Sequence, residues 1–422
     1  MTLAATFLAG AKSRLLPASI PFRFFAAAAV FHVLLWLVLL AGANEATSFR
    51  GGPGPTLAAV HILVLGVLTT TAMGASAQLL PVATRHALVA VWPIRLVFWL
   101  TVPGIAALIV GMYAANLEIL IPAAVVTVVG LLLYAGLLAD NLRRAGNLPV
   151  VAAYGWAALM ALVLLVGLGL ALALDYEMGA LPNHPAAALA HMILGGFGFM
   201  GLLVMGFSHV LVPMFALAAA PPSRPSFIAF ALAAAAVMLG SVGALADSTP
   251  TLTVAALIGL GAAAMHLWLM SRVLKGGMRK RLGQSFLLIR AAWILLPATL
   301  LVGLAALYGL AGSNGPTLFG FLLIAGWLLT FLLGILQRIL PFLASMHASR
   351  AAGAAPPLLS ELAASAPLKL HAVCHGVAVA VLLFAIATDS TWLARVGSAV
   401  GFVGAVAFAW FTAGVTRRAL RW

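Results

Sequence analysis

Charged side chains are scarce in this sequence, at only 7% of 422 residues, whereas 64% of the residues are hydrophobic. A soluble domain uses about 25% charged residues to cover its surface, so this composition excludes one. In lipid, only helices and closed barrels satisfy every backbone hydrogen bond internally. The long apolar runs also lack the two-residue alternation of barrel strands, which predicts an all-helical integral membrane protein.

Cysteine is almost absent as well. The single Cys374 excludes an intramolecular disulfide framework and any zinc or iron–sulfur site built from several cysteines. Carboxylates are nearly missing from the apolar runs, so a proton relay or a cation-transport pathway lacks its usual residues. The chain forms one transmembrane domain over residues 1–422 rather than a membrane anchor with a soluble part.

Turn residues divide the apolar sequence into twelve runs, each long enough to cross a bilayer as a helix. We expect spans at 21–42, 56–82, 88–113, 116–138, 149–174, 186–217, 226–246, 251–274, 286–311, 316–346, 366–388 and 391–416.

The distribution of charge along these spans predicts their orientation. With both termini cytoplasmic, 20 of the 22 Lys and Arg residues lie on the inner side, and only Arg50 and Arg395 lie outside. This is the positive-inside pattern, and it predicts a multi-pass protein of a bacterial-type inner (plasma) membrane. The net charge of +14 is therefore explained by topology next to the lipid bilayer, and we expect no nucleic-acid partner.

An internal repeat divides the twelve spans into three. The second, sixth and tenth spans each end in a Gly-x6-Pro sequence, which begins at Gly74, Gly206 and Gly334 and so recurs at spacings of 132 and 128 residues. The repeat predicts three tandem four-helix units related by pseudo-threefold symmetry, approximately at 21–138, 149–274 and 286–416. Each unit has an even number of helices, so all three have the same orientation, unlike the inverted repeats of many transporters.

Histidines are the only abundant ionisable side chains inside the spans, and neutral imidazole is a common metal and haem ligand. His61 and His191 lie at similar depth near the outer face, each followed by glycine that would let a flat macrocycle approach the helix. We interpret them as two axial ligands of a b-type haem, with His32 as a substitute ligand. Arg395 is placed to pair with the haem propionates.

A second group of histidines lies nearer the cytoplasm. His371 and His375 share one helical face because they are four residues apart, and His209 and His266 lie at a similar depth. Together they could bind copper or another metal if the helices bring them together. The alternative is that each imidazole only bonds a neighbouring helix; we favour ligation for His61 and His191 and leave the inner group open. His86 and His184 lie in loops, where we expect no role.

Three four-helix units with a histidine on a second helix resemble subunit I of the haem–copper oxidases and nitric oxide reductases. His61, Gly74 and Leu80-Pro81 follow the order of that superfamily's second span, and the resemblance implies that His61 is a low-spin haem ligand and that Arg395 binds propionates. The segments Pro21-Phe22-Arg23-Phe24-Phe25 and Asn147-Leu148-Pro149-Val150 are similar to the NnrS family of twelve-span haem- and copper-containing proteins linked to nitric oxide and denitrification.

The departures from these families limit the chemistry. Position 195 is glycine where the oxidases need the tyrosine of His-x-x-x-Tyr, and the seventh and tenth spans contain no histidine. The NnrS signature His-Glu-Met is also missing at His61. We therefore expect a divergent relative that does not reduce oxygen or pump protons.

The resulting expectation is a haem-b protein that handles nitric oxide or another diatomic gas, or that exchanges electrons with a partner. Whether it is an enzyme stays open. Two alternatives remain: a twelve-span permease without a cofactor, and a structural subunit of a respiratory or assembly complex.

Overall fold

The computed structural model describes residues 14–88, 90–351 and 359–421, and within these ranges the chain is helical without any strand. Twelve helices in this part of the chain are long and apolar enough to cross a membrane, so the predicted all-helical membrane fold is confirmed. The predicted boundaries are correct to within a few residues at most ends, although the fourth span continues to Arg143 rather than ending at 138. Lys12, one of the predicted inner charges, lies outside the described residues.

The elements follow one another as α2 (Ser19–Ala41), α3 (Ala43–Ala46), α4 (Pro55–His61), η2 (Ile62–Thr69), α5 (Thr70–Thr84), α6 (Trp92–Tyr113), α7 (Leu117–Arg143), α8 (Pro149–Met178), α9 (His184–Ile193), η3 (Leu194–Gly201), α10 (Leu202–Ala216), α11 (Ser223–Leu245), α12 (Thr249–Gly276), α13 (Gln284–Leu307), α14 (Gly315–Phe321), η4 (Leu322–Leu329), α15 (Thr330–Ala351), α16 (Leu359–Leu362), α17 (Ser365–Ala387) and α18 (Thr391–Leu420).

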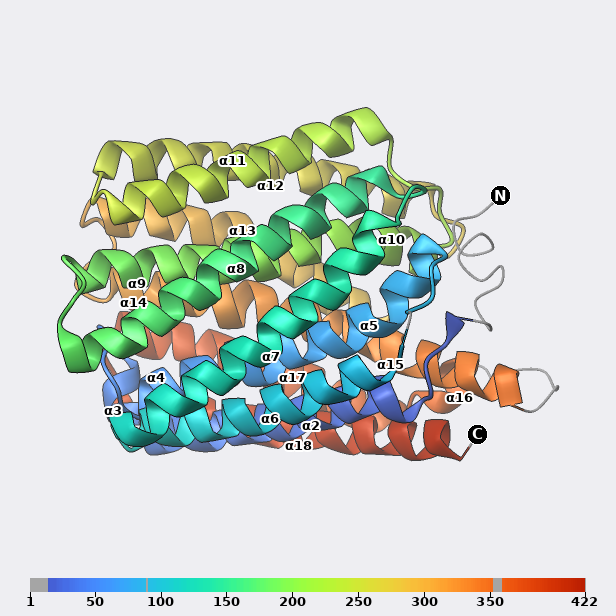
Figure 1. Ribbon diagram of the computed structural model, residues 1–422, viewed down its shortest axis with the longest axis horizontal. Coiled ribbons are helices and arrows are strands. Elements are labelled where there is room, and N and C mark those ends of the chain that lie inside the picture. Colours follow the sequence, from blue (N-terminus) through green and yellow to red (C-terminus); the bar gives the residue numbers. More distant parts are fainter. Residues whose placement is uncertain (1–13, 89, 352–358, 422) are drawn as a thin grey trace.

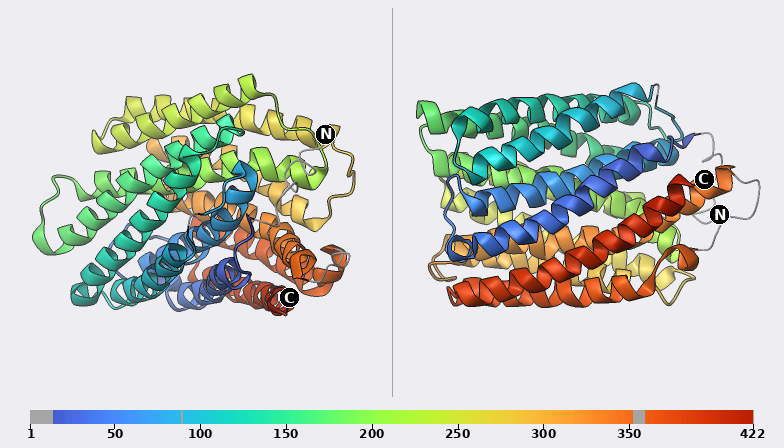
Figure 2. Two further views of the ribbon diagram at one scale, coloured as in Figure 1. Left: turned by 45° about the vertical axis from the view of Figure 1, so that its right-hand side comes forward. Right: turned by 90° about the horizontal axis from the view of Figure 1, so that it is seen from below.

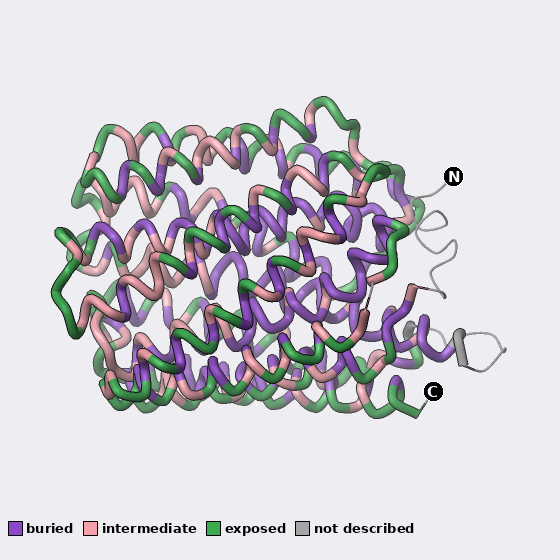
Figure 3. The backbone as a smooth tube through the Cα atoms, viewed as in Figure 1, coloured by how far each residue is buried: buried purple, intermediate pink, exposed green. Residues whose placement is uncertain are grey.

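Three of the twelve spans form the interior of the bundle. These are the continuous helices α4-η2-α5, α9-η3-α10 and α14-η4-α15, of which 67%, 67% and 72% of the most apolar stretch is buried, against 28–44% for the other nine. Buried backbone accordingly runs through the middle of the bundle, and exposed residues follow its outer helices (Figure 3). The first and last spans, α2 and α18, pack side by side (Figure 2).

Each inner helix contains a π-helical segment: η2, η3 or η4. A π turn bonds residues five apart and widens the helix; the hydroxyls of Thr69, Thr70 and Thr330 also donate to carbonyls five residues back. The three π segments contact one another. They begin at Ile62, Leu194 and Leu322, which gives the same two spacings as the Gly-x6-Pro sequences.

The repeated glycines make equivalent contacts. A Cβ atom at Gly74 would lie 2.7 Å from Phe24 Cβ on α2, and one at Gly206 would lie 2.7 Å from Tyr154 Cβ on α8. At Gly334 it would lie 2.9 Å from the Ser285 carbonyl on α13. Each glycine therefore allows an inner helix to approach the helix that precedes it.

Three outer hairpins, α6–α7, α11–α12 and α17–α18, also share one turn. A residue with positive φ (Ala115 at 51°, Asp247 at 48° or Asp389 at 50°) precedes the cap of the second helix. The backbone N–H of that cap residue donates to a carbonyl five residues back, at 2.8–2.9 Å in all three hairpins. The cap side chains are those of Asn116, Ser248 and Ser390.

The described chain begins and ends at the same end of the bundle (Figure 1). We call it the basic end, because α7 ends there at Arg143 and the loops there contain Arg144, Arg279, Lys280 and Arg281. The positive-inside orientation assigned from the sequence stays a prediction, in which this end is cytoplasmic.

Candidate functional site

The structure brings His61 and His191 together in the half of the bundle away from the basic end. Their ring centroids are 6.5 Å apart and the ring planes are inclined by only 29°. A metal ion held between two imidazoles has nitrogens about 2 Å away on each side, which separates the ring centroids by roughly 6 Å. The observed separation is therefore close to that expected for two imidazoles that would bind one metal, and it is too large for stacked rings in contact.

Hydrogen bonding leaves His61 with a free nitrogen. Its Nδ1 lies 3.0 Å from the Leu57 carbonyl, one turn earlier in α4. A carbonyl can only accept, so Nδ1 bears the proton and Nε2 keeps its lone pair. Such a bond to the far nitrogen is what fixes the orientation and tautomer of most metal-bound histidines. His61 is thus prepared to bind a cation through Nε2.

His191 is held by the neighbouring helix α8. A Cβ atom at Gly169 would approach His191 Cε1 to 2.8 Å, so only glycine leaves room for this ring position. Its Nδ1 is buried without a hydrogen bond of normal geometry, although the Leu165 backbone on α8 lies close enough to interact with the ring. His61 and His191 are both half-buried.

The helices that present the two histidines diverge at this point. The π segments η2 and η3 contact each other, but the backbones of α4 and α9 do not pack closely together among the described contacts. The two imidazoles span the gap between them. The π segments begin shortly after the two histidines in the sequence, at Ile62–Thr69 and Leu194–Gly201. Such segments are frequent at functional sites.

Loops tie the ends of these helices together next to the histidine pair. Arg50, before α4, donates to Thr317 Oγ1 at 2.8 Å and to the Ser313 carbonyl, and the Thr317 hydroxyl in turn donates to the Phe49 carbonyl at 2.9 Å. Asp175, at the end of α8, accepts from His184 Nδ1 at 2.7 Å at the start of α9. The chain that leads into α4 and the start of α9, the two helices that carry His61 and His191, are therefore held by hydrogen bonds.

The structure does not bring Arg395 to the pair. Arg395 is exposed on α18, and the described neighbours of α18 are α2, α3, α15 and α17, not α4 or α9. Of the two arginines at this end of the bundle, Arg50 lies in the loop that leads into α4.

The four histidines of the predicted inner site separate into two places. His209 and His266 have ring centroids 5.8 Å apart, and His371 lies 5.8 Å from His375. No described ring contact joins the two pairs, and α17 is not a neighbour of α10 or α12. In the part of the chain that the structure describes, no three His, Cys, Asp or Glu side chains converge to hold a metal ion. The residues do not fit a copper ion bound by all four.

His32 lies in the second of these places rather than beside His61. Its ring centroid is 6.1 Å from that of His371, and both of its nitrogens are buried without a hydrogen bond. His371 Nδ1 donates to the Gly404 carbonyl at 3.2 Å, and His375 Nε2 lies 2.8 Å from Thr330 Oγ1. His371 and His375 each bond a neighbouring helix through one nitrogen, as the structural alternative expects, whereas His371 Nε2 and His375 Nδ1 are buried without a hydrogen bond. His32 is not positioned as a substitute for either outer ligand.

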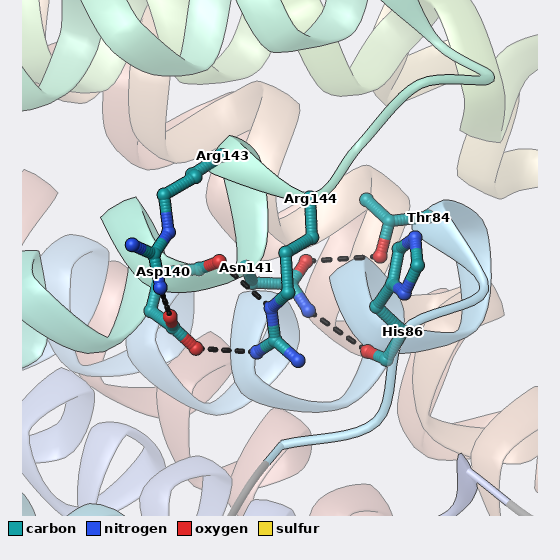
Figure 4. A network of polar contacts seen from close by, with 6 residues as sticks. All are labelled: Thr84, His86, Asp140, Asn141, Arg143 and Arg144. Atoms are coloured by element: carbon teal, nitrogen blue, oxygen red, sulfur yellow. Dashed lines mark hydrogen bonds and ion pairs between the residues drawn. The ribbon is translucent and has the colours of Figure 1, made fainter.

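Two further histidines, His86 and His347, have backbone contacts of their own. His86 has an exposed side chain, and its carbonyl accepts from Asn141 Nδ2 at 2.8 Å. Asn141 Oδ1 accepts from Thr84 at 2.9 Å, so this network joins the ends of α5 and α7 beside the Asp140 ion pairs (Figure 4). His347 lies near the end of α15, inside the tenth span rather than beyond its predicted end at 346. It is within hydrogen-bond distance of the Leu343 carbonyl (2.8 Å) and the Leu16 carbonyl (3.0 Å).

Sequence reasoning missed Gly169, Tyr154 and Thr330, which contact the histidines from other helices. None of the three had a distinguishing signal, since Gly169 lies two residues from Gly167 in a span rich in alanine. No protein-family model matches the chain, and no match is found among curated proteins.

Proposed function

We propose that the chain is a haem-b-binding membrane protein whose axial ligands are His61 and His191. The observation that carries the proposal is the pair of nearly parallel imidazoles, 6.5 Å apart, with the Nδ1 proton of His61 held by the Leu57 carbonyl. Haem iron bound in this way supplies one-electron redox chemistry, with the potential tuned by ligands and burial. The protein's own part is to hold both rings and to exclude water.

Of the two roles considered, electron transfer agrees better with two imidazole ligands than gas binding. A diatomic gas needs a free axial position, and here both would be filled. Gas handling would require His61 or His191 to leave the metal. We therefore propose exchange of electrons with a partner, in the bilayer or at its surface, as the primary activity.

The relation to subunit I of the haem–copper oxidases and to NnrS-like proteins is part of the same proposal. It is supported by the repeated features of the three inner helices, whose π segments and glycine contacts recur at the same two sequence spacings. The identical turns of the three outer hairpins add support. We propose that these features reflect three tandem four-helix units in a bacterial-type inner membrane, with the basic end and both termini cytoplasmic.

Optical spectroscopy on purified protein tests the proposal. We expect a Soret band from about one haem per chain, and a reduced spectrum that carbon monoxide leaves unchanged because no axial position is free. A large change on adding carbon monoxide would overturn electron transfer in favour of gas binding. Absence of any haem band, combined with solute uptake into proteoliposomes, would favour the permease; absence of both, with a co-purifying complex, would favour the structural subunit.

A further inference from the structure

A half-buried arginine, Arg338, lies in the inner helix α14-η4-α15. Its Nε donates to Ser285 Oγ at 2.8 Å, and its Nη2 donates to the Leu282 carbonyl just before α13. These bonds use two of the five N–H groups of the guanidinium, so three remain as donors. An ionisable side chain within a membrane span is costly and usually marks a site. The protein contacts of Arg338 therefore satisfy its guanidinium only in part.

The charge next to Arg338 is a second guanidinium, that of Arg279, rather than a carboxylate. The Arg279 side chain is exposed and has no hydrogen bond or ion pair with any residue that the structure describes. Its backbone N–H donates to the Ala216 carbonyl at 3.2 Å, so the loop that contains it is fixed against the end of α10. Two like charges held near each other repel, and an anion that contacts both would remove the repulsion.

The sequence around this arginine pair contains no acid, since neither Asp nor Glu occurs between Asp247 and Glu361. Six exposed cations lie on α12, on α13 or in the loop between them, and none forms an ion pair within the described chain. They are Arg272, Lys275, Arg279, Lys280, Arg281 and Arg290. A cluster of about four to eight basic residues at the end of a membrane helix is typical of binding to anionic lipids.

The first turn of α13 adds a weaker attraction for an anion. A Cβ atom at Gly283, which precedes α13, would lie 3.6 Å from Arg338 Nη2. This turn has no side-chain cap and no acidic residue. The positive end of the helix dipole therefore lies beside the Arg338 guanidinium. The helix end only supplements the two arginines, whose charges are larger.

We propose that Arg338 and Arg279 bind the phosphate of an anionic phospholipid in the bilayer leaflet at the basic end. A guanidinium can donate two parallel N–H groups to one phosphate, and Arg338 has three donors free for such a bond. Arg279 contributes a second positive charge from a loop whose backbone is fixed. The bound lipid links α15 to the connection between α12 and α13, and this role is independent of the proposed haem.

Apolar side chains beside the arginines indicate that the phosphate belongs to a lipid rather than to a free ion. Met278 directly precedes Arg279 and is 65% exposed, and Leu287 in the first turns of α13 is also 65% exposed. On α12, the Arg272 guanidinium lies 5.0 Å from the centre of the Trp268 ring. Tryptophan is enriched where hydrocarbon meets the headgroups. A free phosphate would gain nothing from these apolar side chains, whereas a phospholipid would.

Native mass spectrometry of the purified protein in detergent tests the site. The protein would be titrated separately with phosphatidylglycerol, phosphatidylcholine and inorganic phosphate. We expect phosphatidylglycerol to bind roughly tenfold more tightly than phosphatidylcholine, because the choline group cancels the charge that a basic cluster attracts. Inorganic phosphate should bind more weakly than phosphatidylglycerol, because it lacks the hydrocarbon chains.

Three variants locate the binding site. Arg338→Gln should weaken phosphatidylglycerol binding about tenfold, as expected for a hydrogen bond to a charged group. Arg279→Gln should weaken it about fivefold, as expected for one basic side chain near the bilayer surface. Arg224→Gln is the matched control, because Arg224 is also exposed at the basic end, in the first turn of α11, and it should leave binding unchanged.

Arg279→Gln is the decisive variant, because Arg338 also bonds Ser285 and its replacement changes packing as well as charge. Unchanged binding in Arg279→Gln, or an equal loss in Arg224→Gln, would overturn the proposal. Binding of inorganic phosphate as tight as that of phosphatidylglycerol would also overturn it, because the site would then take a free ion. His61→Ala should bind the lipid normally, which separates this site from the proposed haem.

Discussion

Gly169 lies directly against the imidazole of His191, so that a Cβ atom at position 169 would approach Cε1 to 2.8 Å. The contact joins α8 to α9 at the depth of the proposed haem ligand. It makes the position of His191 depend on a residue that is not itself a ligand.

Replacing this glycine should therefore disturb the ligand without removing it. We expect Gly169→Ala to weaken haem binding roughly tenfold, the lower range for a change in the residues that orient a metal ligand. Gly167→Ala is a matched control, because nothing lies within 4 Å of a Cβ there. The haem content of the two purified variants would be measured by absorbance. An equal loss of haem in both variants would contradict a role for the Gly169–His191 contact.

The repeated glycines should matter for packing rather than for the cofactor. A Cβ at Gly334 would lie 2.9 Å from the Ser285 carbonyl and 3.0 Å from Ile289. The Ser285 carbonyl belongs to the backbone of α13, which cannot move away easily. We expect Gly334→Ala to destabilise the fold by about 1–3 kcal/mol, as overpacking usually does. Unfolding in mixed detergent micelles would measure it, and Gly376→Ala, whose Cβ meets open space, should be neutral.

Thr330 connects the π segment η4 to the buried His375. Its hydroxyl donates to the Ala325 carbonyl at 3.1 Å, so His375 Nε2, 2.8 Å away, acts as the donor to the Thr330 oxygen. Thr330→Val leaves that N–H buried and unpaired, which should cost about 1–3 kcal/mol. Thr388→Val removes an exposed hydroxyl that bonds only within its own helix and should change nothing; equal stability of both variants would refute a role for the Thr330 bond.

The proposed orientation is testable by chemical labelling. In a Cys374→Ala background, Ser313→Cys places the label in the loop before α14, and Ser223→Cys places it at the first residue of α11, which begins at the basic end. A membrane-impermeant maleimide added to intact spheroplasts should label position 313 and reach position 223 only after lysis. The opposite pattern would invert the topology.

Hydropathy predicted the twelve spans because each one needs about 20 apolar residues, a requirement that composition alone reveals. It also gave the depth of each histidine, and the pairing of His61 with His191 follows from matched depth. Depth does not specify position around the bundle axis. His209 and His371 were therefore grouped together although they lie in different parts of the bundle, and His32 was assigned to the wrong neighbours.

Further repeated features are visible in the sequence. Gly66, Gly198 and Gly326 recur at the same spacings as the Gly-x6-Pro glycines, and Gly66 and Gly198 face α2 and α8 through Phe31 and Ala161. The π segments had no such signal, because pairing five residues apart depends on packing of the inner helices rather than on residue type.

The most direct test of the central claim is the haem content of three single-histidine variants, measured from the Soret absorbance per chain. His61→Ala and His191→Ala should each lose most of the haem, because each removes one of the two imidazoles whose ring centroids are 6.5 Å apart. His86→Ala, whose exposed ring lies in a loop, should keep it. Full haem content in both ligand variants, or none in the unmodified protein, would contradict the account.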